Sequence, residues 1–241
     1  MKERSAAISS TIVLLLTVCA VSFFPLAKGQ PDTPLPVILI HGYRQDASSW
    51  SIWEELLLND GIPFHSVTFS QSDDSCGSAM DHAIELGQIV QQVRQETGSE
   101  RVNIVGFSKG GLDARVYLQG GTDDVANLIM IGTPNAGSPL AVIYSDEEWC
   151  LPAGDDLKPG SDATQAIQNL NTNYHTISGD VLWGWWYPGN PEVPGRDDWV
   201  VPVKSVESEG YFQFRGRTPD NHLDLQTENE YNLAHSILAG N

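Results

Sequence analysis

Ser108 lies at the centre of the pentapeptide Gly106-Phe107-Ser108-Lys109-Gly110, which follows an apolar run and precedes a stretch compatible with a helix. A serine hydroxyl becomes an effective nucleophile when a sharp strand-to-helix turn holds it clear of the backbone, beside a general base. Glycines flank such a turn because a side chain there would collide with the neighbouring strand or helix. The setting predicts a catalytic nucleophile. Without it, the same five residues would indicate only a tight turn.

A nucleophilic serine needs an imidazole base, and in this type of sheet the chain order is serine, acid, histidine. Three histidines follow Ser108. His175 falls in an expected strand and His235 in an expected terminal helix, where a packed or surface histidine is the simpler interpretation. His222 instead follows the polar turn 218–221, from which a loop can aim its ring at the sheet edge. We therefore predict His222 as the base.

The acid that orients this base is predicted among the aspartates between Ser108 and His222. Asp197 and Asp198 stand together just before the apolar run 199–203. We favour Asp198, and the choice between the two stays open. Asp180, after the preceding expected strand, is the reserve candidate, because many aspartates in so acidic a chain are surface charges.

Two backbone amides usually stabilise the oxyanion that forms during acyl transfer. The amide of Lys109, directly after the nucleophile, is one predicted donor. The loop after the first apolar strand supplies the other, where Gly42 permits close approach and Tyr43 offers its amide. His41 is then expected to brace this loop by a hydrogen bond rather than to take a proton.

Strands alternate with helices along the chain, which predicts an α/β fold with a parallel central sheet and helices on both faces. Residues 135–165 break the alternation and are interpreted as a small insertion or lid over the sheet edge. The helix from residue 78 carries an apolar stripe at intervals of three and four. Strands are expected at 36–40, 63–69, 102–105, 125–131, 174–178, 199–203 and 211–215, and the other helices at 50–58, 112–118, 163–170 and 228–238.

The N-terminus predicts a secretory signal peptide over residues 1–29. Lys2 and Arg4 precede the apolar segment 12–24, and Ala27 and Gly29 supply small residues at the minus-three and minus-one positions of a cleavage site. The apolar part is shorter than the roughly 20 residues that span a bilayer. Of 241 residues, 212 would remain, enough for one catalytic domain over 30–241. We expect an exported monomer, extracellular or periplasmic.

The net charge of the mature chain restricts which binding partners and substrates are expected. After cleavage, 10 of the 13 Lys and Arg and 30 of the 31 Asp and Glu remain, a net charge of −20. Such a surface repels nucleic acid and disfavours a polyanionic substrate.

Cys76 and Cys150 would survive processing and are predicted to pair in an oxidising compartment; two separate thiols are the alternative. Their spacing does not resemble a zinc site.

Several segments together resemble the α/β-hydrolase superfamily, and more narrowly its secreted lipases and esterases of the triacylglycerol lipase type. The segments are 37–42, which is similar to the oxyanion strand, 102–111, similar to the nucleophile elbow, and the Gly-Thr-Pro turn within 131–138. Segments 198–202 and 222–224 resemble the acid-bearing and histidine-bearing loops. The resemblance spans nearly the whole mature chain. It implies triad roles for Ser108, Asp198 and His222 and an oxyanion hole at Tyr43 and Lys109.

Two departures from that pattern limit what the resemblance implies. Lys109 replaces the histidine or glutamine often found after the serine, which changes the charge near the site and weakens inference about the substrate. Some lipases of this type also bind calcium through an aspartate after the histidine loop. Asp224 fits that position, but no convincing second ligand accompanies it, so we predict no metal and no cofactor.

The richest aromatic segment, 182–188, contains Trp183, Trp185 and Trp186. These rings either line or cover an acyl-binding pocket, or bury ordinary core surface. Their place between an expected strand and the predicted acid favours a substrate-binding role.

The sequence thus predicts a secreted carboxylic ester hydrolase that forms an acyl-enzyme on Ser108. Its expected partners are small-molecule or lipid esters, with transient contact at a lipid interface left open. Two alternatives remain: an acyltransferase or thioesterase with the same triad, and a non-catalytic lipid-binding protein of the same fold.

Overall fold

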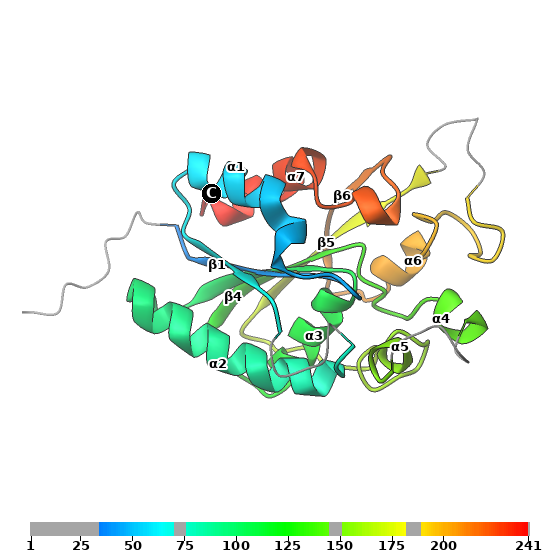
Figure 1. The fold of residues 1–241 in the computed structure, drawn as a ribbon, viewed down its shortest axis with the longest axis horizontal. Coiled ribbons are helices and arrows are strands. Elements are labelled where there is room, and N and C mark those ends of the chain that lie inside the picture. The colour runs from blue at the N-terminus through cyan, green and yellow to red at the C-terminus, as the bar shows by residue number, and fades with distance from the viewer. Residues whose placement is uncertain (1–33, 70–75, 145–150, 182–188, 241) are drawn as a thin grey trace, which may run out of the picture.

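In the part of the chain that the structure describes, six parallel strands form the central sheet in the order β2-β1-β3-β4-β5-β6 (Figure 1). The computed structural model describes residues 34–69, 76–144, 151–181 and 189–240. The predicted alternation of strands and helices around a parallel sheet is confirmed. The strands are β1 (Val37–Ile40), β2 (Phe64–Val67), β3 (Val102–Phe107), β4 (Val125–Ile131), β5 (Asn173–Gly179) and β6 (Gln213–Thr218).

Helices cover both faces of the sheet, with α1 (Ser51–Asn59) and α7 (Glu228–Leu238) on one and α2 (Ala79–Thr97) and α3 (Lys109–Leu118) on the other (Figure 1). The strands β1 and β3 are buried along their whole length, as expected for strands packed between two helical layers. Separate apolar clusters fill the two interfaces, one beneath α1 and α7 and one beneath α2 and α3. This arrangement fixes the strand ends from which the loops emerge.

The helix α2 shows how the sequence specifies an element in this fold. Ser78 caps its first turn by accepting a hydrogen bond from the amide of Asp81 at 3.0 Å, and Gly98, with φ 70°, ends it. The apolar stripe predicted from the sequence is buried: Leu86, Val90 and Val93 pack in the cluster that contains the strands, and Ala79 and Ala83 pack with residues of α3.

Short elements lie in the loops that follow the carboxyl ends of the strands. They are η1 (Ala47–Trp50), α4 (Leu140–Ile143), α5 (Ala153–Asp156), α6 (Val203–Val206) and η4 (His222–Asp224). Among its described residues, the insertion expected over 135–165 contains two single-turn helices, α4 and α5.

Residues 163–170 do not form the helix that the sequence predicts. The guanidinium of buried Arg115 donates to the carbonyl oxygen of Ala166 at 2.8 Å, and the amide of Asn169 donates to the Tyr174 hydroxyl at 3.0 Å. Side chains from α3 and β5 thus take backbone groups that an α-helix would pair with one another. Only a turn remains.

The apolar run 199–203 is not a strand, contrary to the prediction. The carboxylate of Asp198 accepts hydrogen bonds from the amides of Val200 at 3.0 Å and Val201 at 2.7 Å, which ties them into a turn. Pro202 lacks an amide hydrogen and precedes α6. Its pairing with Asp197 is an isolated bridge.

The last strand also lies two residues later than predicted, from Gln213 rather than 211. The rings of Tyr211 and Phe212 pack against Tyr174 instead. Within the part of the chain that the structure describes, no helix is long and apolar enough to cross a membrane.

Candidate active site

Ser108 stands at the carboxyl end of β3 and forms the N-cap of α3. Its φ of 51° and ψ of −121° are rare for a residue other than glycine and typical of functional sites. A Cβ at Gly106 would lie 2.6 Å from the Gly111 nitrogen, and one at Gly110 would lie 2.5 Å from the His41 carbonyl oxygen. The steric requirement predicted for both flanking glycines is confirmed.

His222 connects Ser108 with Asp198 through its two ring nitrogens. The Nε2 atom lies 2.9 Å from Ser108 Oγ, and Nδ1 lies 2.7 Å from Asp198 Oδ2. Because an ionised carboxylate only accepts, Nδ1 donates to Asp198 and Nε2 accepts the serine hydroxyl hydrogen. The side chains of His222 and Asp198 are 8% and 0% exposed, which shields this chain of hydrogen bonds from water.

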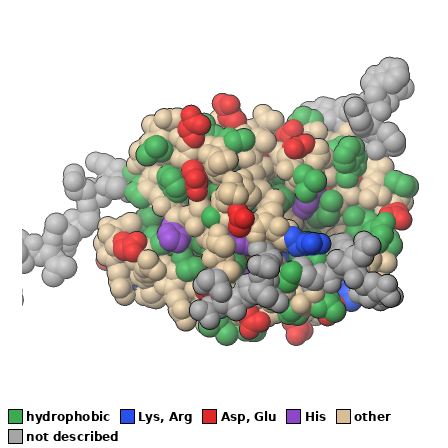
Figure 2. All heavy atoms as spheres, in the orientation of Figure 1, with side chains coloured by type: hydrophobic (Ala, Val, Ile, Leu, Met, Phe, Trp, Pro, Cys, Tyr) green, Lys and Arg blue, Asp and Glu red, His purple; other side chains and the backbone are tan. Residues whose placement is uncertain are grey.

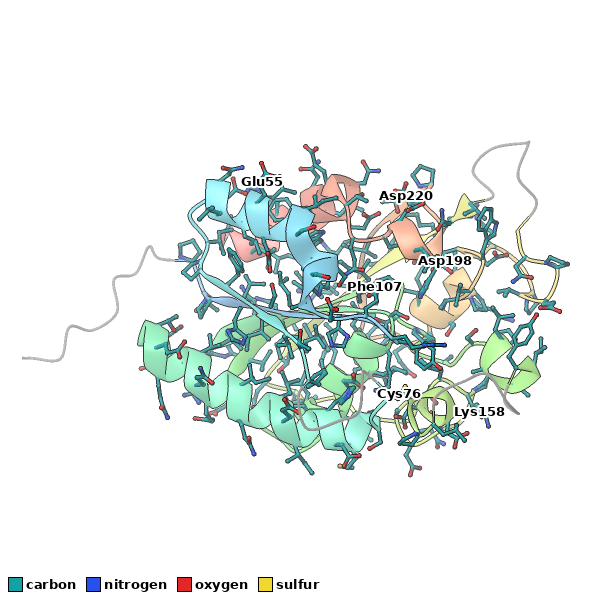
Figure 3. The ribbon with its side chains drawn as sticks, in the orientation of Figure 1. Glu55, Cys76, Phe107, Lys158, Asp198 and Asp220 are labelled. Carbon is teal, nitrogen blue, oxygen red and sulfur yellow. The ribbon has the colours of Figure 1, made fainter. Side chains whose placement is uncertain are left out.

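The position of Asp198 is fixed by its own surroundings. Its Oδ1 accepts the two amides of the following turn, and its carbonyl oxygen accepts the His222 amide at 2.8 Å. Gly179, at the end of β5, permits the approach, since a Cβ there would lie 2.8 Å from the Asp198 Cβ. Asp198 and Phe107, which precedes Ser108, lie at the same end of the sheet (Figure 3).

Neither of the other two acid candidates faces His222. The Oδ1 atom of Asp197 accepts the amides of Asn190 at 3.1 Å and Trp199 at 2.7 Å, and burial raises the pKa of its carboxyl. Asp180 is fully buried and forms an ion pair with Arg196. The structure therefore brings Asp198 alone of these three to the base.

The other two histidine candidates also lie away from Ser108. His175 is buried in β5, with Nε2 3.3 Å from Asn127 Oδ1, and His235 in α7 pairs with Asp60 at 3.2 Å. Their interpretation as packed or surface histidines is consistent with these contacts.

The loop after β1 packs directly against the nucleophile. A Cβ at Gly42 would lie 2.8 Å from the Phe107 ring and 3.1 Å from the Ser108 Cβ. Nδ1 of His41 donates to the Gly42 carbonyl oxygen at 2.9 Å, the bracing contact expected of it. Burial lowers the pKa of His41, which favours the neutral form of its ring. Because Gly42 has no side chain, the loop can pass close to Ser108, and Tyr43 is its next residue.

The Lys109 side chain points into the protein, which was not predicted from the sequence. It is 1% exposed, and Nζ lies 2.6 Å from Asp113 Oδ1 and 3.2 Å from His82 Nδ1. The carboxylate of Asp113 therefore offsets the positive charge of Lys109, which was expected to change the charge near the site. The spacing of four between Lys109 and Asp113 on a helix was the available signal.

Several predicted residues fall outside the described ranges or outside this arrangement. Trp183, Trp185, Trp186 and Cys150 lie outside the described residues, so the binding segment and the disulfide to Cys76 stay predictions. Asp224 accepts a hydrogen bond from Asn221 at 2.5 Å. Across the described ranges, no three His, Cys, Asp or Glu side chains are grouped as metal ligands.

Two exposed apolar side chains border the triad candidates. Trp199 follows Asp198 and is 40% exposed, and Leu223 follows His222 and is 76% exposed. Trp199 also lines a hollow of about 260 Å³, together with Val181, Pro219, Asp220, Asn221 and Asp224. Neither residue stands out in the sequence.

The parallel sheet, the strained serine after β3 and the later aspartate and histidine define an α/β-hydrolase fold. Within this class, the chain belongs to the palmitoyl protein thioesterase family, whose model matches residues 36–176. Ser108 lies inside the matched region, whereas Asp198 and His222 lie beyond it.

The chain is also similar to two curated triacylglycerol lipases. It is 31% identical over 175 residues to that of Burkholderia plantarii, covering 69% of this chain and 48% of the relative. It is 32% identical over 158 residues to that of Pseudarthrobacter phenanthrenivorans, covering 62% and 49%. The chain therefore spans about half the length of these relatives.

Among solved structures, the mature form of the Bacillus licheniformis lipase BlEst2 matches with a TM-score of 0.64 at 21% identity. The match covers 89% of this chain and 95% of that one. At this identity the likeness supports the fold.

Proposed function

We propose that this protein is a serine hydrolase that cleaves carboxylic esters through an acyl-enzyme on Ser108. The observation that carries the proposal is the buried hydrogen-bond chain from Ser108 Oγ through His222 to Asp198. This constellation activates a serine on several unrelated folds. Family membership and the two relatives named triacylglycerol lipases support the same class of reaction.

In the first half-reaction, Ser108 Oγ attacks the ester carbonyl carbon while His222 Nε2 takes the hydroxyl proton. Asp198 keeps the other ring nitrogen protonated and stabilises the imidazolium that results. The amides of Tyr43 and Lys109 donate to the oxyanion. The tetrahedral intermediate collapses, the bond to the alcohol oxygen breaks, and His222 protonates the departing alcohol.

In the second half-reaction, His222 takes a proton from water, and the hydroxide attacks the acyl carbon. The bond to Ser108 Oγ then breaks, His222 returns the proton to the serine, and a carboxylic acid leaves. Acyl transfer to an alcohol other than water uses the same steps.

A thioester substrate is the second candidate, favoured by the thioesterase family whose model matches residues 36–176, more than half of the chain. The same triad attacks a thioester carbonyl, with a thiol as the leaving group. Comparing kcat/KM for an oxygen ester and a thioester of the same acyl group separates the two candidates.

The experiment that tests the proposal compares p-nitrophenyl ester hydrolysis by the wild type and by Ser108→Ala, together with fluorophosphonate labelling and peptide mapping. We expect label on Ser108 and a rate reduced by several orders of magnitude in the variant. Equal rates in the two proteins, or label on another residue, would refute the assignment. Absence of turnover of any ester or thioester by the wild type would instead support a lipid-binding protein.

The aromatic segment 182–188 is proposed to contact the acyl chain. The exposed Trp199 and Leu223 beside Asp198 and His222 support an apolar approach to the site. Trp185→Ala and Trp186→Ala are expected to lower activity on long acyl chains relative to short ones. An unchanged chain-length profile would oppose this role.

Export is proposed from the signal-like pattern of residues 1–29, with a Cys76–Cys150 disulfide formed outside the cytoplasm. Acidic side chains (red) are spread over the face drawn in Figure 2 and outnumber basic ones (blue), which agrees with an uncharged ester as substrate. N-terminal sequencing of exported protein and mass measurement with and without reductant test both statements.

A further inference from the structure

Four ionisable side chains, three of them buried and the fourth, Asp156, partly buried, meet beneath the nucleophile turn. Lys109 Nζ donates to Asp113 Oδ1 at 2.6 Å, and His82 Nδ1 donates to Asp113 Oδ2 at 2.7 Å. Asp156 Oδ2 lies 4.0 Å from the same ammonium and accepts the Ala79 amide at 2.6 Å. The cluster therefore joins the first turns of α2 and α3 to α5.

A second set of contacts runs from this cluster to the loop after β1. The His82 ring stacks on Phe69 with centroids 3.9 Å apart and planes inclined by 12°. Phe69 also meets the His41 ring in an edge-to-face arrangement, with centroids 5.6 Å apart, and His41 donates to the Gly42 carbonyl oxygen. Lys109 and the loop that carries Tyr43 are thus connected by an unbroken series of packed, buried groups.

Stability alone gives a weak reason for such a cluster. Lys109, His82 and Asp113 are each 1% exposed, and removing charges from water costs about as much as their mutual attraction returns. A pair of apolar side chains could link α2 to α3 at no such cost. Buried networks with satisfied partners do, however, hold their members in one arrangement. Burial alone would raise the pKa of Asp113, but the Lys109 ammonium and the His82 hydrogen bond lower it overall.

We propose that the Lys109 side chain is a positioning group for the oxyanion hole, acting through Asp113 and His82. Its ammonium anchors the first turn of α3. The backbone amide of Lys109 is thereby held at a fixed position relative to the backbone amide of Tyr43. The proposal rests on the proposed function, because it assigns both amides to the oxyanion of an acyl-transfer reaction.

Asp113→Asn tests this idea with a small change in shape. It keeps a side chain of the same size and removes the charge that holds the ammonium. We expect kcat for p-nitrophenyl butyrate to fall at least tenfold while KM changes less than twofold, because the oxyanion exists only in the transition state and intermediate. The inhibition constant of a trifluoromethyl ketone, which forms an oxyanion adduct on the serine, should weaken by a similar factor.

Asp124→Asn is the matched control. Asp124 is also a buried carboxylate, accepts the Tyr117 hydroxyl at 2.9 Å and lies 3.7 Å from Arg94 of α2. It precedes β4, at the end of the sheet opposite Ser108. This variant should lose thermal stability yet keep kcat and ketone affinity within twofold of the wild type.

A double variant, Lys109→Met with Asp113→Leu, removes the two opposite charges together. It tests the positioning role of Lys109 if Asp113→Asn fails to fold. We expect a folded protein whose kcat and ketone affinity remain at least tenfold impaired. Wild-type kcat and ketone affinity in either folded variant would overturn the positioning role. Ser108→Ala, assayed beside them, separates the causes: full activity in that variant refutes the proposed function itself.

Discussion

Asp197 and Asp198 are neighbours in the chain, yet their carboxylates serve different parts of the molecule. Asp198 Oδ2 lies 2.7 Å from His222 Nδ1, whereas Asp197 Oδ1 accepts the amides of Asn190 and Trp199. Both side chains are fully buried, so burial does not distinguish them. Only the direction of each carboxylate assigns one to the imidazole and the other to the loop that begins at residue 189.

Asparagine substitutions of these two aspartates should therefore have different effects. Asp198→Asn removes the acceptor that fixes the His222 tautomer, and we expect kcat to fall by roughly 10³–10⁴. Asp197→Asn should keep kcat within about fivefold and mainly change the thermal midpoint, since its carboxylate contacts a loop rather than the imidazole. Steady-state kinetics and thermal unfolding of both variants check this. Equal losses of kcat would contradict the assignment.

Gly106→Ala should disrupt the nucleophile turn. The added Cβ would lie 2.6 Å from the Gly111 nitrogen and 2.8 Å from the Gly110 carbonyl carbon, and neither backbone atom can move without displacing Ser108. We expect loss of fluorophosphonate labelling and a stability loss of about 1–3 kcal/mol, typical of overpacking. Gly210→Ala is the control, because nothing lies within 4 Å of the position that its added methyl group would occupy. Normal labelling of Gly106→Ala would show that the turn adapts.

Periodicity and residue order were sufficient to predict the elements that depend on local pattern. The helix α7 lies at Glu228–Leu238 and the strand β4 at Val125–Ile131, as predicted, because continuous apolar runs and regular stripes identify buried strands and helices. The chain order serine, aspartate, histidine likewise led to three side chains that the fold brings together.

The two misassigned elements have a common physical cause, which is that side chains take backbone groups that a helix or a strand would otherwise pair. Arg115 takes the Ala166 carbonyl oxygen that a helix over 163–170 would use. Asp198 takes the Val200 and Val201 amides that a strand would offer to a neighbour. The inward direction of Lys109 has another cause, since its ammonium donates to Asp113, whose second carboxylate oxygen accepts from His82 on another helix. The contacts of Arg115 with Ala166 and of His82 with Asp113 join distant segments and have no local signal, whereas Asp198 accepts amides only two and three residues ahead of it.

Thr227→Ala should weaken the start of α7, which follows the His222 loop. Thr227 and Glu230 form a reciprocal capping box, with the Thr227 amide donating to Glu230 Oε2 at 3.1 Å. We expect a loss of about 1 kcal/mol in the free energy of unfolding, measured by urea denaturation. Asn232→Ala, at an exposed position of the same helix, should cost nothing. Equal losses would mean that the cap does not contribute.

His175 should make the protein less stable in mild acid. Burial, and to a lesser extent the charge of Arg215, lowers the pKa of His175 from 6.5 to about 4. Between those values the unfolded chain binds a proton that the folded protein does not, so stability falls as pH decreases from about 6.5 towards 4. A shift of this size corresponds to about 2 to 3 kcal/mol at pH 4.5.

The measurement compares urea unfolding of the wild type and His175→Leu at pH 7 and pH 4.5. Other groups also titrate: burial lowers the pKa of His41, and it raises the pKa of Asp156 and Asp197, which acts in the opposite direction. Because both proteins keep these groups, the difference between them isolates His175. Asn127 Oδ1, which contacts His175, keeps a donor in Asn173 at 3.2 Å. The leucine variant should lose less stability on acidification than the wild type by about 2 to 3 kcal/mol; the same loss in both would show that His175 keeps an ordinary pKa in the folded protein.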